Sequence, residues 1–175
     1  SQCTDEDKRS LLSLQSAVRA QKPRYVYLGG GSCVGGSLQP YVVDPRCQKI
    51  ISIDPRPKSL PDTRGVQEYA DNSTETMLVE LRRIPGADVE KIQSLEAGTD
   101  TLRPADVLAR PDFCFVDGQH TDEAALRDAR FCRSVVQSDG CIAFHDANLV
   151  YTGIQRFVKD LAQSGLSFRP YVLPD

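Results

Sequence analysis

The chain has 175 residues, of which 40% are hydrophobic, and its formal net charge is −3. This length suits one domain over residues 1–175 with a substantial core, and the mildly acidic charge disfavours nucleic acid and anionic membranes as partners. No run approaches the roughly 18 apolar residues of a membrane span, and the polar start is unlike a signal peptide. We therefore expect a cytoplasmic protein.

Its six cysteines form no CxxC pair and are expected to be reduced, mostly buried thiols.

Helical and strand patterns alternate along the chain. Residues 5–21 have apolar side chains on one helical face and a cap at Thr4 or Asp5, and we expect this segment, within residues 1–22, to pack on the domain. Strands are predicted at residues 25–28, 49–54, 91–95, 113–117, 141–145 and 168–173. Further helices are predicted from 36 or 37 to 44, and at 72–84, 122–136 and 152–164. The proline-rich stretch 55–61 is expected to close the second strand.

Short, nearly continuous apolar strands joined by helices predict a mostly parallel, doubly wound α/β sheet covered on both faces, which is a three-layer Rossmann-like fold. In such a sheet, ligands bind beyond the carboxyl ends of the strands, near the point where the strand order reverses. The glycine cluster and several acids and histidines of this chain follow predicted strands directly. The functional site is therefore expected along that rim of the sheet.

A glycine cluster at residues 29–36 follows the first predicted strand. Glycines allow a sharp turn and a close ligand, and the next helix offers free backbone N–H groups at its start. Asp54, at the end of the second strand, can accept both hydroxyls of a ribose. The spacing of Gly31 and Gly35 suits S-adenosylmethionine, which has no pyrophosphate, better than a nicotinamide cofactor, because Val34 occupies the place of a third glycine. A turn without any ligand is the alternative.

Both histidines of the chain lie beside aspartates at predicted strand ends, in the segments Asp117-Gly118-Gln119-His120 and His145-Asp146. Carboxylates from Asp117 and Asp146 would suit a hard divalent cation such as Mg²⁺. An imidazole ionises near neutral pH, so it could take a proton from a substrate hydroxyl. A capping or core hydrogen-bonding role is the alternative for each histidine.

These motifs together resemble class I S-adenosylmethionine-dependent methyltransferases, and especially the macrocin and mycinamicin sugar O-methyltransferases and the related cephalosporin-biosynthesis proteins. The resemblance spans residues 25–173 and is carried by the glycine turn with Ser37, by Ile53-Asp54, and by the two acid–histidine segments. It implies a set of cofactor-binding residues: Gly29, Gly31, Gly35, Ser37, Asp54, Glu96 and Ala97. It also implies Asp117, His145 and Asp146 as metal ligands, with His120 as the general base beside Asp117.

Two features depart from that family pattern. Gly29 stands where these enzymes usually carry an acid that pairs with the methionine ammonium of the cofactor. The chain also ends at Asp175, just after its sixth predicted strand, so the usual C-terminal antiparallel hairpin is expected to be incomplete. An incomplete sheet exposes unpaired backbone groups, which makes a homo-oligomer an expectation.

We expect an S-adenosylmethionine-dependent, Mg²⁺-assisted O-methyltransferase whose acceptor is a hydroxyl of a small molecule such as a sugar or another natural product. The main alternative is a non-catalytic cofactor-binding or interaction module with a degenerate site. A metal-dependent phosphohydrolase would need further histidines, and a nicotinamide oxidoreductase would need a hydride-transfer constellation that the sequence does not provide.

Overall fold

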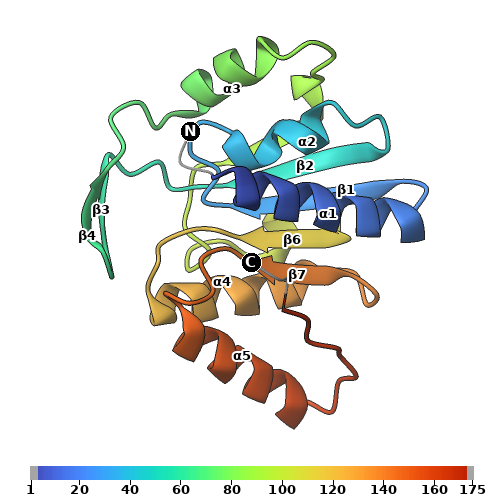
Figure 1. Ribbon diagram of the computed structural model, residues 1–175, viewed down its shortest axis with the longest axis vertical. Coiled ribbons are helices and arrows are strands. Elements are labelled where there is room, and N and C mark those ends of the chain that lie inside the picture. The colour runs from blue at the N-terminus through green and yellow to red at the C-terminus, as the bar shows by residue number, and fades with distance from the viewer. Residues whose placement is uncertain (1–3, 173–175) are drawn as a thin grey trace.

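A computed structural model describes residues 4–172 of the chain. Its centre is a sheet of five parallel strands in the order β5-β2-β1-β6-β7 (Figure 1). The strands are β1 (Tyr25–Gly30), β2 (Cys47–Ile53), β5 (Ile92–Leu95), β6 (Phe113–Val116) and β7 (Cys141–Phe144). The order reverses between β1 and β6, so a crevice is expected at the carboxyl ends of these two strands. The predicted doubly wound parallel sheet is confirmed.

Helices cover both faces of the sheet (Figure 1). One face carries α1 (Asp5–Gln21), the short helices η1 (Gly36–Leu38) and α2 (Gln39–Val42), and α3 (Thr74–Arg82). The other face carries α4 (Asp122–Val135) and α5 (Tyr151–Gln163). Two further 3-10 turns, η2 (Val89–Lys91) and η3 (Pro104–Asp106), lie in the connections before β5 and β6. None of the described helices is long and apolar enough to cross a membrane.

Polar contacts hold α1 against the sheet. The helix begins with a capping box, in which the Thr4 hydroxyl accepts the backbone N–H of Asp7 (3.1 Å) and the Asp7 carboxylate accepts that of Thr4 (2.6 Å). Further along, the buried Gln15 amide donates to the Pro40 carbonyl (2.8 Å). Gln15 and the Tyr25 hydroxyl also donate to the carboxylate of Asp44, at 3.2 and 2.8 Å. The capping box sets where α1 begins, and the contacts of Gln15 fix the middle of the helix relative to β1 and α2.

The structure corrects two predictions. The proline-rich stretch 55–61, expected to close the second strand, leads into an antiparallel hairpin of β3 (Ser59–Asp62) and β4 (Gly65–Glu68), which stands apart from the main sheet (Figure 1). The predicted closing strand at 168–173 does not form over residues 168–172, and residue 173 lies outside the described residues. There the side chains of Tyr171 and Val172 are 80% and 95% exposed. A strand needs a partner for its backbone, and within residues 4–172 the sheet ends at β7.

The other predicted helices and strands agree with the structure to within a few residues. The prediction of free thiols is confirmed for the five cysteines within residues 4–172, of which Cys47, Cys114 and Cys132 are buried. Cys33 is half-buried and Cys141 is exposed, whereas Cys3 lies outside the described residues.

Gly31 provides a stability test of the turn after β1. Its φ is +74°, and a Cβ built on it would lie 2.0 Å from the carbonyl oxygen of Asp117. We expect Gly31→Ala to lower the free energy of unfolding by roughly 3–5 kcal/mol, because the clash adds to the about 1–2 kcal/mol of a left-handed alanine. Urea denaturation measures this loss. Gly86→Ala is the matched control, since its φ is +80° and no described atom lies within 4 Å of its Cβ. Equal losses of unfolding free energy in Gly31→Ala and Gly86→Ala would contradict the close approach of Gly31 to the Asp117 carbonyl.

Candidate active site at the carboxyl ends of the strands

The glycine turn and Asp54 lie together at the ends of β1 and β2. Gly31 donates its N–H to the carbonyl of Ile53 (2.9 Å), which continues the pairing of the two strands by one residue. Gly35 has φ +89°, and a Cβ there would lie 3.0 Å from the Leu81 side chain of α3. Both glycines therefore allow a conformation and an approach that a larger residue would not.

The buried carboxylate of Asp54 ties the turn to β2. One carboxylate oxygen accepts the backbone N–H of Cys33 (2.8 Å), and the other accepts that of Arg56 (2.7 Å). An ionised carboxylate has about four lone-pair sites, so Asp54 has acceptor capacity beyond these two hydrogen bonds. The structure thus brings the predicted residues Gly31, Gly35 and Asp54 into one region of the rim.

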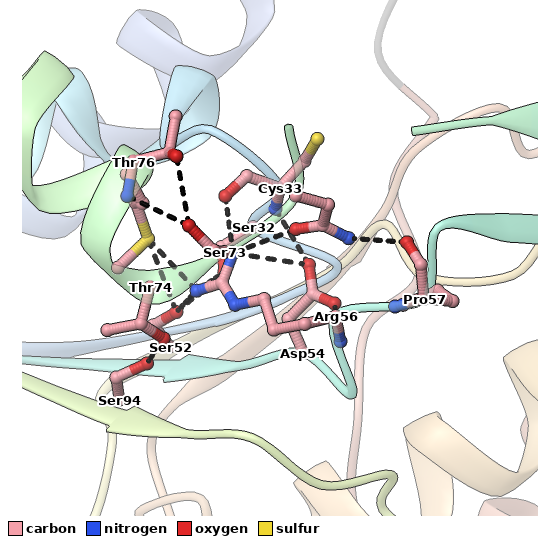
Figure 2. A network of polar contacts seen from close by, with 12 residues as sticks. Ser32, Cys33, Ser52, Asp54, Arg56, Pro57, Ser73, Thr74, Thr76 and Ser94 are labelled. Atoms are coloured by element: carbon pink, nitrogen blue, oxygen red, sulfur yellow. Dashed lines mark hydrogen bonds and ion pairs between the residues drawn. The ribbon is translucent and has the colours of Figure 1, made fainter. Parts of the chain in front are cut away.

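Arg56 supports the glycine turn from its buried side, and the sequence analysis did not assign this residue to the site. Its guanidinium is 6% exposed and lies 3.7 Å from the Asp54 carboxylate (Figure 2). The same group donates to a ring of partners: the carbonyl of Cys33, the hydroxyls of Ser32 and Ser52, the amide oxygen of Asn72 and the sulfur of Met77. No periodicity or motif spacing marks Arg56, because its role depends on three segments that meet only in the fold.

The space beside Gly29, where the sequence analysis noted the lack of an acid, is filled by neighbouring side chains. A Cβ at Gly29 would lie 3.2 Å from the Tyr27 phenol and 3.2 Å from Leu38. Both the Tyr27 and the Ser37 side chains are nearly or fully buried there, at 0% and 5% exposed. Only a small residue therefore fits at position 29 beside the existing Tyr27 ring.

The predicted adenine-side residues Glu96 and Ala97 follow β5, which is the neighbour of β2. Asp54 donates its backbone N–H to the carbonyl of Leu95 (3.0 Å), so the ends of the two strands lie side by side. Glu96 is exposed and Ala97 is half-buried. These two residues are thus next to Asp54 along the rim, on the side away from β6.

The predicted acids and histidines converge beyond β6 and β7. Asp117 Oδ1 lies 3.0 Å from His145 Nδ1 and 3.5 Å from His120 Nε2. Asp146 Oδ2 lies 3.4 Å from His120 Nε2 and 3.6 Å from His145 Nδ1. The four side chains are between 12% and 29% exposed, so they are shielded yet reachable from solvent.

Asp7 adds a carboxylate that the sequence analysis did not assign to the site. Its Oδ1 lies 3.1 Å from His145 Nε2, while its Oδ2 serves the capping box of α1 with Thr4. The capping box places Asp7 at the start of α1, and the sequence could have indicated this position of Asp7. Its contact with His145, however, depends on how the helix packs.

The β3–β4 hairpin contributes Arg64, also absent from the predicted site. Arg64 donates to His120 Nδ1 (2.6 Å) and to the Asp62 carboxylate (2.7 Å), and it lies 3.5 Å from the Asp146 carboxylate. Because a guanidinium only donates, His120 Nδ1 must accept, which assigns the ring proton to Nε2. The turn segment Asp62-Thr63-Arg64-Gly65 has the residues of a tight turn, and this signal could have revealed the hairpin.

His145 carries the main electrostatic perturbation of the cluster. Burial lowers its pKa, but contact with Asp117 and the charges of Asp146 and Asp7 outweigh burial and raise the pKa to about 9. In the absence of a metal, His145 is therefore an imidazolium at neutral pH. In the hairpin, hydrogen bonds from Arg64 hold the pKa of Asp62 below its ordinary value.

The same cluster has the geometry of a candidate metal site. Asp117, His120 and His145 each offer one donor atom, and these atoms lie within 4.8 Å of one another. Among the described residues, His120 Nε2 and both ring nitrogens of His145 are buried without an aligned hydrogen-bond partner. In the neutral tautomers that leave His120 Nε2 and His145 Nδ1 without a proton, these two nitrogens could bind a cation beside Asp117. Two imidazoles with carboxylates suit Mn²⁺ or Zn²⁺ better than Mg²⁺, which prefers oxygen ligands.

Comparison with known proteins identifies the class. Residues 26–147 match the family Methyltransf_24, described as a methyltransferase domain. The chain therefore belongs to this family of methyltransferase domains, and its sheet order agrees with the class I methyltransferase fold. No curated protein matches the chain.

Solved structures share the fold at low sequence identity. The N-methyltransferase NodS of Bradyrhizobium japonicum, solved with S-adenosyl-L-homocysteine, has a TM-score of 0.58 and 11% identity over 90% of this chain and 76% of its own. The precorrin 8W decarboxylase of Methanobacterium thermoautotrophicum has a TM-score of 0.56 and 13% identity, over 85% of this chain and 69% of its own. An S-adenosylmethionine-dependent methyltransferase of Clostridium acetobutylicum has a TM-score of 0.51 and 12% identity, over 81% of this chain and 50% of its own.

The raised pKa of His145 predicts a pH dependence of stability. The folded-state pKa of about 9 exceeds the ordinary 6.5, so the stabilisation is complete below pH 6.5 and is lost as the pH rises through 9. We expect a loss of about 2 kcal/mol over this interval, because the partly exposed pair is screened by solvent. Urea denaturation at several pH values, with a chelator present, measures it. His145→Gln should remove this slope, and an unchanged slope in the variant would contradict the assignment.

Proposed function

We propose that the chain transfers the methyl group of S-adenosylmethionine to a hydroxyl of a small molecule. The observation that carries this proposal is the contact between the glycine turn and the acid–histidine cluster. Gly31 packs directly against the backbone of Asp117, so a donor lying over the turn would have its reactive end beside Asp117 and His145. Asp54 lies on the opposite side of the same turn.

The cofactor would lie along the rim from β5 to β6. The remaining lone pairs of Asp54 would accept the ribose hydroxyls, with Glu96 and Ala97 beside the adenine. Gly29, Gly31, Gly35 and Ser37 would present the backbone to the methionine end. The S-adenosyl-L-homocysteine in the NodS structure supports this class of cofactor.

A hydroxyl acceptor fits the cluster better than an amine. A hydroxyl must lose its proton as it attacks, whereas a neutral amine attacks without prior help from a base. His120 would take that proton at Nε2, the nitrogen that faces Asp117 and Asp146, the oxygen would bond to the methyl carbon, and the carbon–sulfur bond would break to leave a neutral thioether. Arg64 now donates to Nδ1, which leaves the ring proton on Nε2, so Arg64 must withdraw and that proton must move to Nδ1, 3.4 Å from the Asp62 carboxylate, before His120 can act. Without a cation, the His145 imidazolium would stabilise the negative charge that develops on the oxygen; with a cation bound, His145 would instead be a neutral ligand.

We also propose a divalent cation at this cluster, held by Asp117, His145 and Asp146 with His120 within reach. When bound, such a cation lowers the pKa of the acceptor hydroxyl. The donor set favours Mn²⁺ or Zn²⁺ over the Mg²⁺ expected from the sequence. Asp7 would orient His145 through Nε2, the nitrogen that faces away from Asp117.

The second candidate is a cofactor-binding module that does not turn over. It is favoured by Arg64, which covers His120 Nδ1, and by Gly29, where the family usually has an acid. Binding of S-adenosylmethionine without methyl transfer to any hydroxyl would distinguish this module from the enzyme. Membership of the macrocin and mycinamicin branch, with a sugar hydroxyl as acceptor, remains part of the proposal.

Calorimetric titration of S-adenosylmethionine tests the cofactor. We expect the wild-type chain to bind, and Asp54→Ala to raise the dissociation constant about 10- to 100-fold, because charged hydrogen bonds to the ribose are lost. Asp71→Ala removes an exposed acid close to the same loops and should leave the constant unchanged. Circular dichroism checks the fold of each variant. A wild type that gives no heat at millimolar cofactor would refute the proposed function.

Titration with Mn²⁺, followed by electron paramagnetic resonance of the free ion, tests the metal site. Arg64→Ala should strengthen Mn²⁺ binding by roughly tenfold, because it removes a guanidinium that competes for Asp146 and His120. Asp117→Asn should abolish binding. Arg82→Ala is the control, since Arg82 pairs with Glu90 on the remote α3 side. The metal proposal fails if Asp117→Asn binds Mn²⁺ as well as the wild type does.

A further inference from the structure

A cavity of about 340 Å³ lies between α1 and α2 and opens onto the acid–histidine cluster. Its polar end is formed by Asp7, Ser37, Asp117 and His145. The rest of its wall is mostly apolar: it comprises Leu11, Leu12, Pro40, Val43, Ile84 and Phe115, together with Gly36 and the polar side chains of Lys8 and Gln39. We call this cavity the α1–α2 groove. Its volume lies within the range of about 300–1,000 Å³ that is typical of small-molecule sites.

We propose that the α1–α2 groove binds the acceptor and that the acceptor is an apolar alcohol or phenol rather than a sugar. The inference rests on the proposed methyl transfer and specifies its substrate class. The acceptor hydroxyl would lie at Asp117 and His145, while its apolar body would extend between the two helices.

The mostly apolar lining of the groove is the reason for assigning an apolar acceptor rather than a sugar. A sugar ring has several hydroxyls, and each one that leaves water without a partner costs free energy. The mostly aliphatic and aromatic wall offers such hydroxyls few partners, but it gains stability by covering an apolar ring or chain. The polar end provides carboxylates and an imidazole within a small space, which suits one hydroxyl.

Two wall residues are exposed although they are apolar. The Leu12 side chain is 49% exposed on α1, and the Val43 side chain is 40% exposed at the end of α2. Both line the groove, so a ligand that fills it would cover both of them. These two side chains add apolar area to a ligand site that continues into the cluster.

The first turn of α1 serves the groove and the cluster together. Asp7 lies at the polar end and contacts His145 Nε2 at 3.1 Å, and Leu11 and Leu12 continue along the same helix. An acceptor that packs on Leu11 and Leu12 therefore touches the helix that orients His145. This arrangement links recognition of the apolar body to the position of the imidazole beside the reacting hydroxyl.

The test uses 2-naphthol, a fluorescent phenol with an apolar body. We expect it to bind the wild-type chain, and Leu12→Glu to weaken binding at least tenfold, because the charge would be placed against the ring. Val79→Glu is the matched control: Val79 is 41% exposed on α3, outside the groove, and its variant should bind within twofold of the wild type. Methyl α-D-glucopyranoside should not displace 2-naphthol. With S-adenosylmethionine added, 2-naphthol should be methylated and the glucoside should not.

S-adenosylmethionine titrations on the same samples separate the two proposals. If the cofactor binds but 2-naphthol does not, or binds Leu12→Glu equally well, the groove proposal is overturned and the proposed function stands. If 2-naphthol binds as expected but the cofactor does not, the proposed function fails. Preferential methylation of the glucoside would overturn the assigned substrate class. Sedimentation of the wild type as a dimer that Leu12→Glu dissociates would also overturn it, since the groove would then bind a second copy.

Discussion

The close contact of Gly31 with the backbone of Asp117 is the constraint on which the rest of the site depends. It lets β1 and β6 continue their pairing past the last strand residues, because Asp117 donates its N–H to the carbonyl of Gly30 (3.1 Å). One strand further, His145 donates in the same way to Val116 (3.0 Å). The residues that carry the chemistry are therefore positioned by the register of the sheet, and a rigid sheet holds them more precisely than free loops would.

Segments distant in sequence bring an excess of negative charge to this point. Four carboxylates, those of Asp7, Asp62, Asp117 and Asp146, surround the two imidazoles. Arg64 and protonated His145 offset only part of that negative charge. The remainder creates a negative potential that attracts cations, and it stabilises the hairpin arginine beside Asp62 and Asp146.

The sequence was sufficient to predict the parallel sheet and the residues at its rim, because β1, β2, β6 and β7 are apolar runs that end in glycines or acids. It did not predict the β3–β4 hairpin, whose exposed strands have no alternating apolar pattern, nor the contacts of Asp7 and Arg64, which arise from packing. The run 168–173 resembles a strand by composition. Residues 168–172 nevertheless have no pairing partner, and pairing cannot be seen in a single segment.

Arg56 has a consequence for the kinetics of ligand binding. Because its guanidinium joins the glycine turn to β2 and α3 through the chain's own groups, the turn is ordered by folding itself (Figure 2). A ligand that docks on this turn then loses little conformational entropy of the loop, so association is limited by diffusion and desolvation rather than by a slow ordering step. Differences in affinity among cofactor analogues should accordingly arise from their dissociation rates.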